Sequence, residues 1–201
     1  MFGALGKSGK PRVLGIDPGL VRTGWAVIEP VGLRASVLGH GVITPPPDAP
    51  LAARLADGAR ALREVLAEFR PELVALEEIF TAPRHPRSAL LMAHMRGAIC
   101  LVLEEASLPI LPLTATTVKQ RLTSSGHASK EQIQRMVARL TDVDTTGRMR
   151  LDETDAIALA LAALYQRSHP LARLTSGRPR LPLATSVTAL RTTKPSGSQT
   201  L

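Results

Sequence analysis

Short apolar runs and longer segments with helical spacing follow one another along most of the chain. Five apolar runs, bounded by Pro, Gly or polar residues, predict strands at 12–17, 23–30, 33–43, within 71–80 ending near Glu77, and at 109–113. Leu51, Leu55, Leu62, Leu66 and Phe69, spaced three, four or seven residues apart with charged residues between them, predict a helix over 51–69. Similar patterns predict helices at 88–106, 114–123, 129–140 and 152–166.

The order of these elements predicts an α/β domain with a mixed five-stranded sheet flanked by helices. A Pro-Val-Gly turn at 30–32 joins the second and third strands, so the first three strands form an antiparallel meander. The later strands alternate with helices, which is typical of parallel pairing. If the first and fourth strands are parallel neighbours, their carboxyl ends meet at one edge of the sheet.

Positive charge is concentrated at the two ends of the chain. The formal net charge is +8, yet residues 13–166 are close to neutral. The segments 1–12 and 167–201 contain only basic charged residues, and Pro, Ser, Thr, Gly and Arg dominate after residue 168. We therefore expect a basic leader at 1–11, a folded domain at 12–167 and a basic, disordered tail at 168–201. Basic ends suit a polyanion such as nucleic acid, or serve only solubility.

Cysteine content and hydropathy bear on the compartment. The single cysteine, Cys100, lies in an apolar stretch, which indicates a buried, inert thiol. No apolar run is long enough to span a membrane, and the N-terminal residues lack a signal-peptide core. We expect a soluble, cytoplasmic protein with no membrane contact.

Four carboxylates carry the strongest chemical signal. Asp17 and Glu77 come at the ends of two predicted strands, and Asp152 and Asp155 share one face of the first turn of the last helix. Acids gathered at one point repel one another unless a cation lies between them. The set therefore predicts a divalent-metal site for cutting phosphodiesters. Glu78 and Glu153 are expected to point away from it.

Each carboxylate also has a purely structural interpretation. Asp152 is a common kind of helix N-cap, and Asp155 complements the helix dipole. Asp17 precedes Pro-Gly, as many turn residues do. Glu77 is harder to explain this way, because an acid within an apolar strand must be paired or exposed. The combination of all four favours a metal site.

Several motifs, taken together and in order, resemble those of the RuvC crossover junction endodeoxyribonucleases. They are VLGIDPGLVRTGWAVIE, LVALEEIF, MRGAI, VKQ, ASKEQIQRMVARL and DETDAIALALAAL, which together cover about residues 12–166. The resemblance implies an RNase H-like fold, a homodimer, and Holliday junction cleavage in recombination and repair. It also implies Mg²⁺ or Mn²⁺ as cofactor, two ions per site, products with 5′-phosphate and 3′-OH ends, and RuvA and RuvB as partners.

The resemblance also assigns individual residues. Asp17, Glu77, Asp152 and Asp155 fall on the family's catalytic and metal-binding acids. Lys119 and Lys130 match lysines that contact DNA and support catalysis, and Phe80 matches an aromatic residue that meets bases near the junction centre. Arg84, His85 and Arg87 follow in a loop and are expected to extend the DNA-binding surface.

The helix at 88–106 is a candidate for the dimer interface. Its face formed by Leu91, Met95, Ala98 and Val102 is apolar, and the same face is equally suited to the core of the domain.

Three other functions fit parts of the sequence. A RuvC-like nuclease of the YqgF group, which acts on RNA, shares the first Asp and the late pair of acids. An actin- or hexokinase-type phosphotransferase shares the first motif but needs a much longer chain. A non-catalytic DNA-binding protein would use only the basic ends. Glu77 in LEEIF, with Lys119 and Lys130, favours the DNA resolvase.

Overall fold

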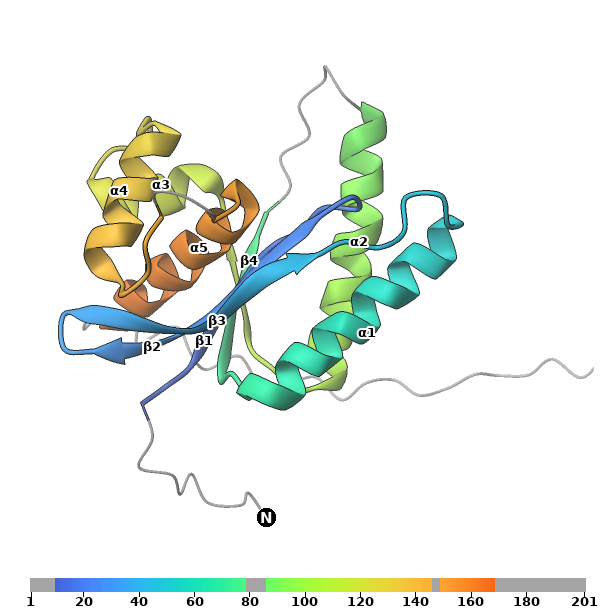
Figure 1. Cartoon of the computed structure of the whole chain (residues 1–201), viewed down its shortest axis with the longest axis horizontal. Helices are drawn as coiled ribbons and strands as arrows, with labels where there is room; N and C mark the ends of the chain where they lie inside the picture. Colours follow the sequence, from blue (N-terminus) through green and yellow to red (C-terminus); the bar gives the residue numbers. More distant parts are fainter. Residues whose placement is uncertain (1–9, 79–85, 146–148, 169–201) are drawn as a thin grey trace, which may run out of the picture.

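The computed structural model describes residues 10–78, 86–145 and 149–168 (Figure 1). Its centre is a five-stranded sheet in the order β3-β2-β1-β4-β5. The strands are β1 (Val13–Asp17), β2 (Thr23–Val31), β3 (Arg34–Ile43), β4 (Leu73–Glu77) and β5 (Ile110–Leu113). β1, β2 and β3 pair antiparallel, whereas β4 lies parallel to both β1 and β5. The predicted mixed sheet is confirmed.

The helices match the predicted positions to within a few residues. They are α1 (Leu51–Phe69), α2 (Pro86–Glu105), α3 (Ala115–Thr123), α4 (Lys130–Leu140) and α5 (Leu151–Ser168). α2 begins at Pro86, two residues earlier than expected, and proline is favoured in the first turn of a helix. Ser129 and Gln132 form the capping box that starts α4, so the position of Lys130 at the beginning of that helix is well defined.

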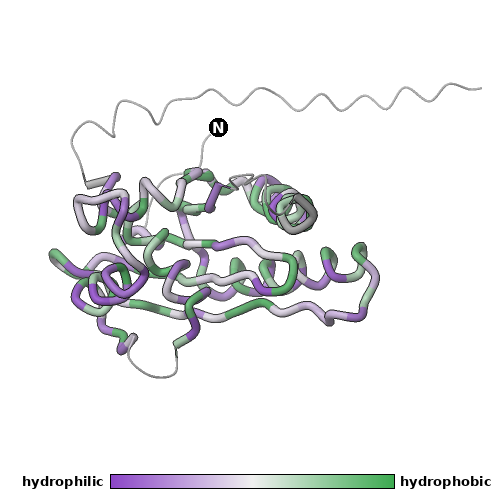
Figure 2. Tube along the Cα trace, turned by 90° about the horizontal axis from the view of Figure 1, so that it is seen from above, coloured by the Kyte–Doolittle hydropathy of each residue, from purple (hydrophilic) through white to green (hydrophobic). Residues whose placement is uncertain are grey.

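Two apolar clusters lie on opposite faces of the sheet (Figure 1). Leu14 and Ile16 of β1 pack with α1 and α2, whereas Val13 lies in the cluster that contains α5. This alternation follows from the two-residue period of a strand. Figure 2 shows the same layers from above, with hydrophobic and hydrophilic positions interleaved along the chain. The sheet therefore has a layer of helices on each face.

α5 packs directly on the centre of the sheet. Every residue from Ala156 to Leu164 is buried, as expected for a helix that is apolar on all sides. Two glycines permit this contact. A Cβ at Gly15 would lie 2.0 Å from the carbonyl oxygen of Ala156, and a Cβ at Gly24 would lie 2.1 Å from that of Asp152. Neither position has room for a side chain.

The predicted interface face of α2 is part of the core of the subunit. Met95 and Val102 are buried against α1 and the sheet, so of the two interpretations of this face the intradomain one is correct. The residues of α2 that face solvent include Leu90 and Leu101, each with 60% of its surface exposed. None of the described helices is both long enough and apolar enough to cross a membrane.

Candidate active site

The first two candidate carboxylates lie side by side at one edge of the sheet. Asp17 ends β1 and Glu77 ends β4, and these strands are parallel with Ile16 opposite Leu76. Asp17 and Glu77 therefore extend from adjacent strand ends, and their side chains form a hydrogen bond. The predicted convergence of these two residues is confirmed.

Burial has the largest effect on the pKa of Asp17. It raises the pKa of Asp17 to about 8, and the hydrogen bond and negative charge of Glu77 add to the shift. The charge of Asp152 acts in the same direction, and Lys130 opposes it. Asp17 therefore keeps its proton at neutral pH unless a cation compensates its buried charge.

The second pair of carboxylates comes from the first turn of α5. Burial raises the pKa of Asp155 to about 6, with a further contribution from the negative charge of Asp17, while Lys130 and Lys119 lower it. Asp152 also contributes to the shifts of both Asp17 and Asp155. Glu77 and Asp152 thus act on Asp17, and Asp17 and Asp152 act on Asp155, although the four acids come from three separate elements.

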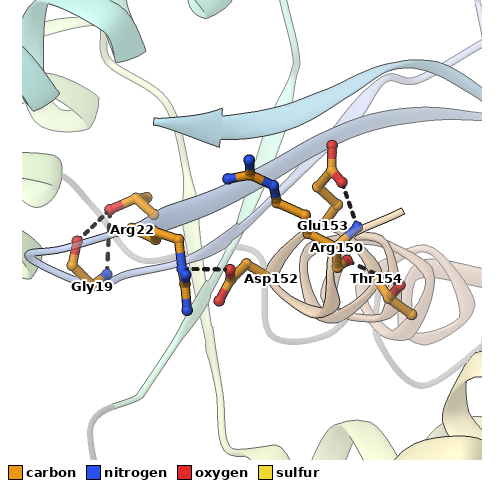
Figure 3. A network of polar contacts seen from close by, with 7 residues as sticks. Gly19, Arg22, Arg150, Asp152, Glu153 and Thr154 are labelled. Carbon is orange, nitrogen blue, oxygen red and sulfur yellow. Dashed lines mark hydrogen bonds and ion pairs between the residues drawn. The ribbon is translucent and has the colours of Figure 1, made fainter. Parts of the chain in front are cut away.

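Gly24 brings α5 to the strand ends. It lies directly opposite Asp17 in the antiparallel pair of β1 and β2, and its missing side chain makes room for the backbone of Asp152. Glu153 fixes the same turn from the other side. One of its carboxylate oxygens pairs with His40 Nδ1 at 3.0 Å. The other accepts a hydrogen bond from the backbone N–H of Arg150 at 2.7 Å (Figure 3).

The two acids expected to point away from the site have other environments. Glu153 pairs with His40 of β3, as just described. Glu78 is exposed, and its backbone N–H donates to the carbonyl oxygen of Leu113. Both residues are therefore suitable comparisons for the four candidate carboxylates.

Both candidate lysines lie at the site. Lys119 of α3 and Lys130 of α4 line a cavity of about 250 Å³ together with Glu77 and Asp155. Apolar side chains from α3, α4 and α5 form the remaining wall. The lysines thus provide positive charge beside the acids, where a phosphate could bind.

Sequence analysis missed two arginines at the site. Arg22, in the turn between β1 and β2, places its Nε 3.0 Å from an oxygen of Asp152 (Figure 3). Arg96 of α2 donates from Nε to the carbonyl oxygen of Glu77 at 3.2 Å. Both lie within motifs quoted above. The signal available for Arg22 was its place in the turn after Asp17, whereas Arg96 lies in the middle of α2, where no local signal connects it with Glu77. Asp152 is engaged by Arg22 and is not a helix N-cap.

The remaining candidate residues cannot be placed at the site. Phe80, Arg84 and His85 lie outside the described residues. Arg87 falls in the first turn of α2, but its side chain is outside the described part of the structure. Their contact with DNA stays a prediction.

The donor set fits a divalent cation by its chemistry. Carboxylate oxygens are the ligands that Mg²⁺ and Mn²⁺ prefer, and Asp17 needs a nearby positive charge to ionise at neutral pH. Within residues 10–78, 86–145 and 149–168, however, no three acidic, histidine or cysteine side chains are arranged as a ready set of ligands. Asp152 is instead occupied by Arg22.

Comparisons with known proteins agree with the geometry. The family model described as crossover junction endodeoxyribonuclease RuvC matches residues 13–163. The RuvC of Bordetella avium is 40% identical over 176 residues, covering 85% of this chain and 96% of that protein. Thermus thermophilus RuvC, solved in complex with a Holliday junction substrate, has a TM-score of 0.72 and 34% identity, covering 79% of this chain and 96% of that one.

A more distant structure supports the fold alone. The yeast mitochondrial Holliday junction resolvase Ydc2 has a TM-score of 0.57 at 13% identity, covering 82% of this chain and 84% of that one. The expected RNase H-like class is confirmed by these similarities. The match to the family model spans both strand ends and α5, and so includes all four candidate carboxylates. The chain belongs to the RuvC family of crossover junction endodeoxyribonucleases.

Proposed function

We propose that this protein resolves Holliday junctions by paired, symmetric hydrolysis of phosphodiesters, in homologous recombination and DNA repair. The observation that carries the proposal is the buried Asp17–Glu77 pair beside Asp155, with Lys119 and Lys130 on the adjoining cavity. Membership of the RuvC family and the similarity to Thermus thermophilus RuvC, solved with a junction, support the same activity.

Each residue has a proposed role in hydrolysis. Asp17, Glu77, Asp152 and Asp155 would hold Mg²⁺ or Mn²⁺, two ions per site, which activate water and stabilise the leaving 3′ oxygen when bound. Asp17 would release its proton when a cation binds, because the cation offsets the burial and the negative charge of Glu77, which together raise the pKa of Asp17. Lys119 and Lys130 bind phosphate and orient the strand. The products carry 5′-phosphate and 3′-OH ends.

We further propose a homodimer that uses the exposed face of α2. A four-way junction is two-fold symmetric, and a C2 dimer supplies two active sites in the matching relation. Leu90 and Leu101 lie on one side of α2, at a spacing of eleven residues, which is three helical turns, and both are largely exposed. Exposed leucines aligned along a helix favour burial against a second copy.

The partners and compartment follow from the same function. RuvA and RuvB, which drive branch migration, are proposed partners in the cytoplasm. The basic leader at 1–11 and the tail at 168–201 are proposed to add contacts to the DNA backbone that are independent of sequence.

The activity can be tested with a synthetic mobile four-way junction in Mg²⁺ or Mn²⁺. Linear duplex and an RNA–DNA hybrid serve as control substrates. We expect paired, symmetric nicks in the junction only. Cleavage of the RNA-containing substrate instead would assign the protein to an RNA-directed nuclease, and tight junction binding without any cleavage would contradict a catalytic role for the four acids.

Two variants link the activity to the proposed residues. Asp17→Asn should abolish cleavage and keep junction binding, because it removes one buried charge without changing size. Glu78→Gln is the matched control, since Glu78 is exposed next to Glu77, and it should cleave like the wild type. Metal-dependent cleavage near the wild-type rate in Asp17→Asn would refute the assignment of Asp17.

A further inference from the structure

The ion pair between Arg22 and Asp152 involves a residue with no role in the function proposed above. The described residues form several ion pairs, and this one includes a candidate carboxylate, Asp152. The Nε–O distance is 3.0 Å, and the two side chains are 55% and 27% exposed. Arg22 can therefore leave Asp152 for solvent or for a ligand without disturbing the core.

The backbone holds Arg22 in place. The hydroxyl of Thr23 donates to the carbonyl oxygen of Gly19 at 2.8 Å and accepts a hydrogen bond from the backbone N–H of Gly19 at 3.2 Å. These two hydrogen bonds close the turn that contains Arg22 (Figure 3). Arg54 of α1 donates to the carbonyl oxygen of Leu20 at 2.9 Å. Because this turn is fixed at both ends, Arg22 starts from a defined point beside the first turn of α5.

We propose that Arg22 takes the place of a cation at Asp152 and is transferred to a DNA phosphate when the cation and the junction bind. This inference rests on the proposed function and adds a regulatory step at the same site. A guanidinium suits both partners, because its planar donors match carboxylate and phosphate oxygens equally well. An exposed ion pair is also weak enough to exchange.

The arrangement of the acids supports the transfer. Asp17, Glu77 and Asp155 lie near one another with Lys119 and Lys130 beside them, whereas Asp152 is paired with Arg22. The charge of Asp152 raises the pKa of both Asp17 and Asp155, so this carboxylate lies close to the other acids even while it is paired with Arg22. Release of Arg22 frees a fourth carboxylate next to the other three.

The transfer couples two binding events. A phosphate that binds Arg22 frees Asp152, and a cation that binds Asp152 frees Arg22. Each ligand therefore raises the affinity for the other, and thermodynamic linkage requires the two effects to be equal. The protein should hold its metal weakly until DNA is bound.

The first test measures cation binding without DNA and without turnover. Calorimetric titration with Mn²⁺ should show affinity about two- to fivefold higher for Arg22→Gln than for the wild type, which is the range that one exposed ion pair supplies. Arg22→Lys keeps the charge and should stay near the wild type. The matched control is Arg60→Gln, which removes the exposed Arg60–Asp57 pair within α1 and should change nothing.

The possible results separate this inference from the proposed function. Equal or weaker Mn²⁺ binding by folded Arg22→Gln would overturn the role of Arg22 and leave the nuclease proposal intact. If Arg22→Gln fails to fold, Arg22→Ala gives the same comparison, with Arg22→Lys again as the control that keeps the charge. Absence of Mn²⁺ binding by both the wild type and Arg22→Gln would overturn this inference, whereas the nuclease proposal is decided separately by junction cleavage.

The second test examines the phosphate. Junction affinity is measured against salt concentration in Ca²⁺, a cation that also prefers carboxylate oxygens, under conditions checked to give no cleavage. The slope of log affinity against log salt should fall by about one unit in Arg22→Gln, as expected for the loss of one phosphate contact. An unchanged slope would show that Arg22 does not pass to DNA and would contradict the transfer.

Discussion

At the scale of single residues, Asp17 combines burial with a close acidic neighbour. Its pKa is raised to about 8, first by burial and then by Glu77, so the cation-free protein holds a proton there at neutral pH. The unfolded chain releases that proton near pH 4. Between these two values the folded state binds more protons than the unfolded state, and stability falls as the pH rises.

Removal of the charge should therefore stabilise the cation-free protein at high pH. In EDTA at pH 8, we expect Asp17→Asn to raise the free energy of unfolding by at least about 1 kcal/mol, or roughly 2–4 °C in Tm. The gain should shrink as the pH falls and be small near pH 4, where the unfolded chain also begins to hold the proton on Asp17. Thermal unfolding from pH 4 to 8 measures this, with Glu78→Gln as the control.

Millimolar Mg²⁺ provides an independent check of the same effect. It should raise the Tm of the wild type at pH 8, because a bound cation compensates the buried charges and ligand binding stabilises the folded state. The gain should be much smaller in Asp17→Asn. A Tm difference between the two proteins that is independent of both pH and Mg²⁺ would contradict a buried acid pair.

Lys119 and Lys130 are the basic residues beside the acids of the site. Lys119 and Lys130 lie close enough to Asp155 to lower its pKa, so they stand beside the place where the scissile phosphate is proposed to bind. Each Ala variant should reduce the slope of log junction affinity against log salt by about one unit. Arg63→Ala is the control, because Arg63 pairs with Glu105 on the opposite side of the sheet. An unchanged slope would place the lysine outside the interface.

At the scale of elements, periodicity predicted the strands and helices well. The antiparallel meander, the parallel pairing of β1 with β4 and the all-apolar α5 follow from apolar runs and turn residues. The exposed side of α2 was not predicted, because the helix is apolar on most of its surface and α1 selects which residues become core. The contact of Arg22 with Asp152 depends on how α5 docks, which no local pattern encodes.

The close contact between β2 and α5 at Gly24 can be tested by substitution. Gly24→Ala would place a Cβ 2.1 Å from the backbone of Asp152, so α5 must move away from β2. We expect a loss of about 1–3 kcal/mol in unfolding free energy, with a large loss of cleavage because Asp152 and Asp155 are displaced. Denaturant unfolding and single-turnover cleavage measure the two effects.

Gly126→Ala is the matched control for that variant. There the nearest atom to an added Cβ, at 2.9 Å, is a side-chain methyl group of Thr116, which can move. Its effect on both stability and cleavage should be clearly smaller. Equal effects of the two substitutions would show that the close approach of α5 to Gly24 is unimportant.

At the scale of the whole molecule, the exposed leucines of α2 predict how two copies meet. Leu101→Glu places a charge on the proposed interface and should convert the dimer into monomers at micromolar concentration, as measured by analytical ultracentrifugation. Leu33→Glu is the control. Leu33 is 92% exposed at the tip of the β2–β3 hairpin, far along the chain from α2, and its substitution should leave the mass unchanged.

Cleavage products give a second measure of the same prediction. The Leu101→Glu protein should lose the coupling between the two nicks in a junction, because one subunit carries one site. A wild-type protein with a monomer mass at all concentrations would contradict the dimer. The contribution of the basic ends to DNA binding stays a prediction, since they lie outside the described residues apart from Lys10, Pro11 and Arg12 and the last turn of α5.

The last helix of the fold supplies both half of the acids and the centre of one core. Asp152 and Asp155 lie more than 130 positions after Asp17, and Ala156–Leu164 fill the face of the sheet that Gly15 and Gly24 leave open. If the four acids cut DNA as proposed, a chain still being synthesised lacks two of them until nearly the whole domain has left the ribosome. Prematurely terminated products lack the same two acids and should not cleave a junction.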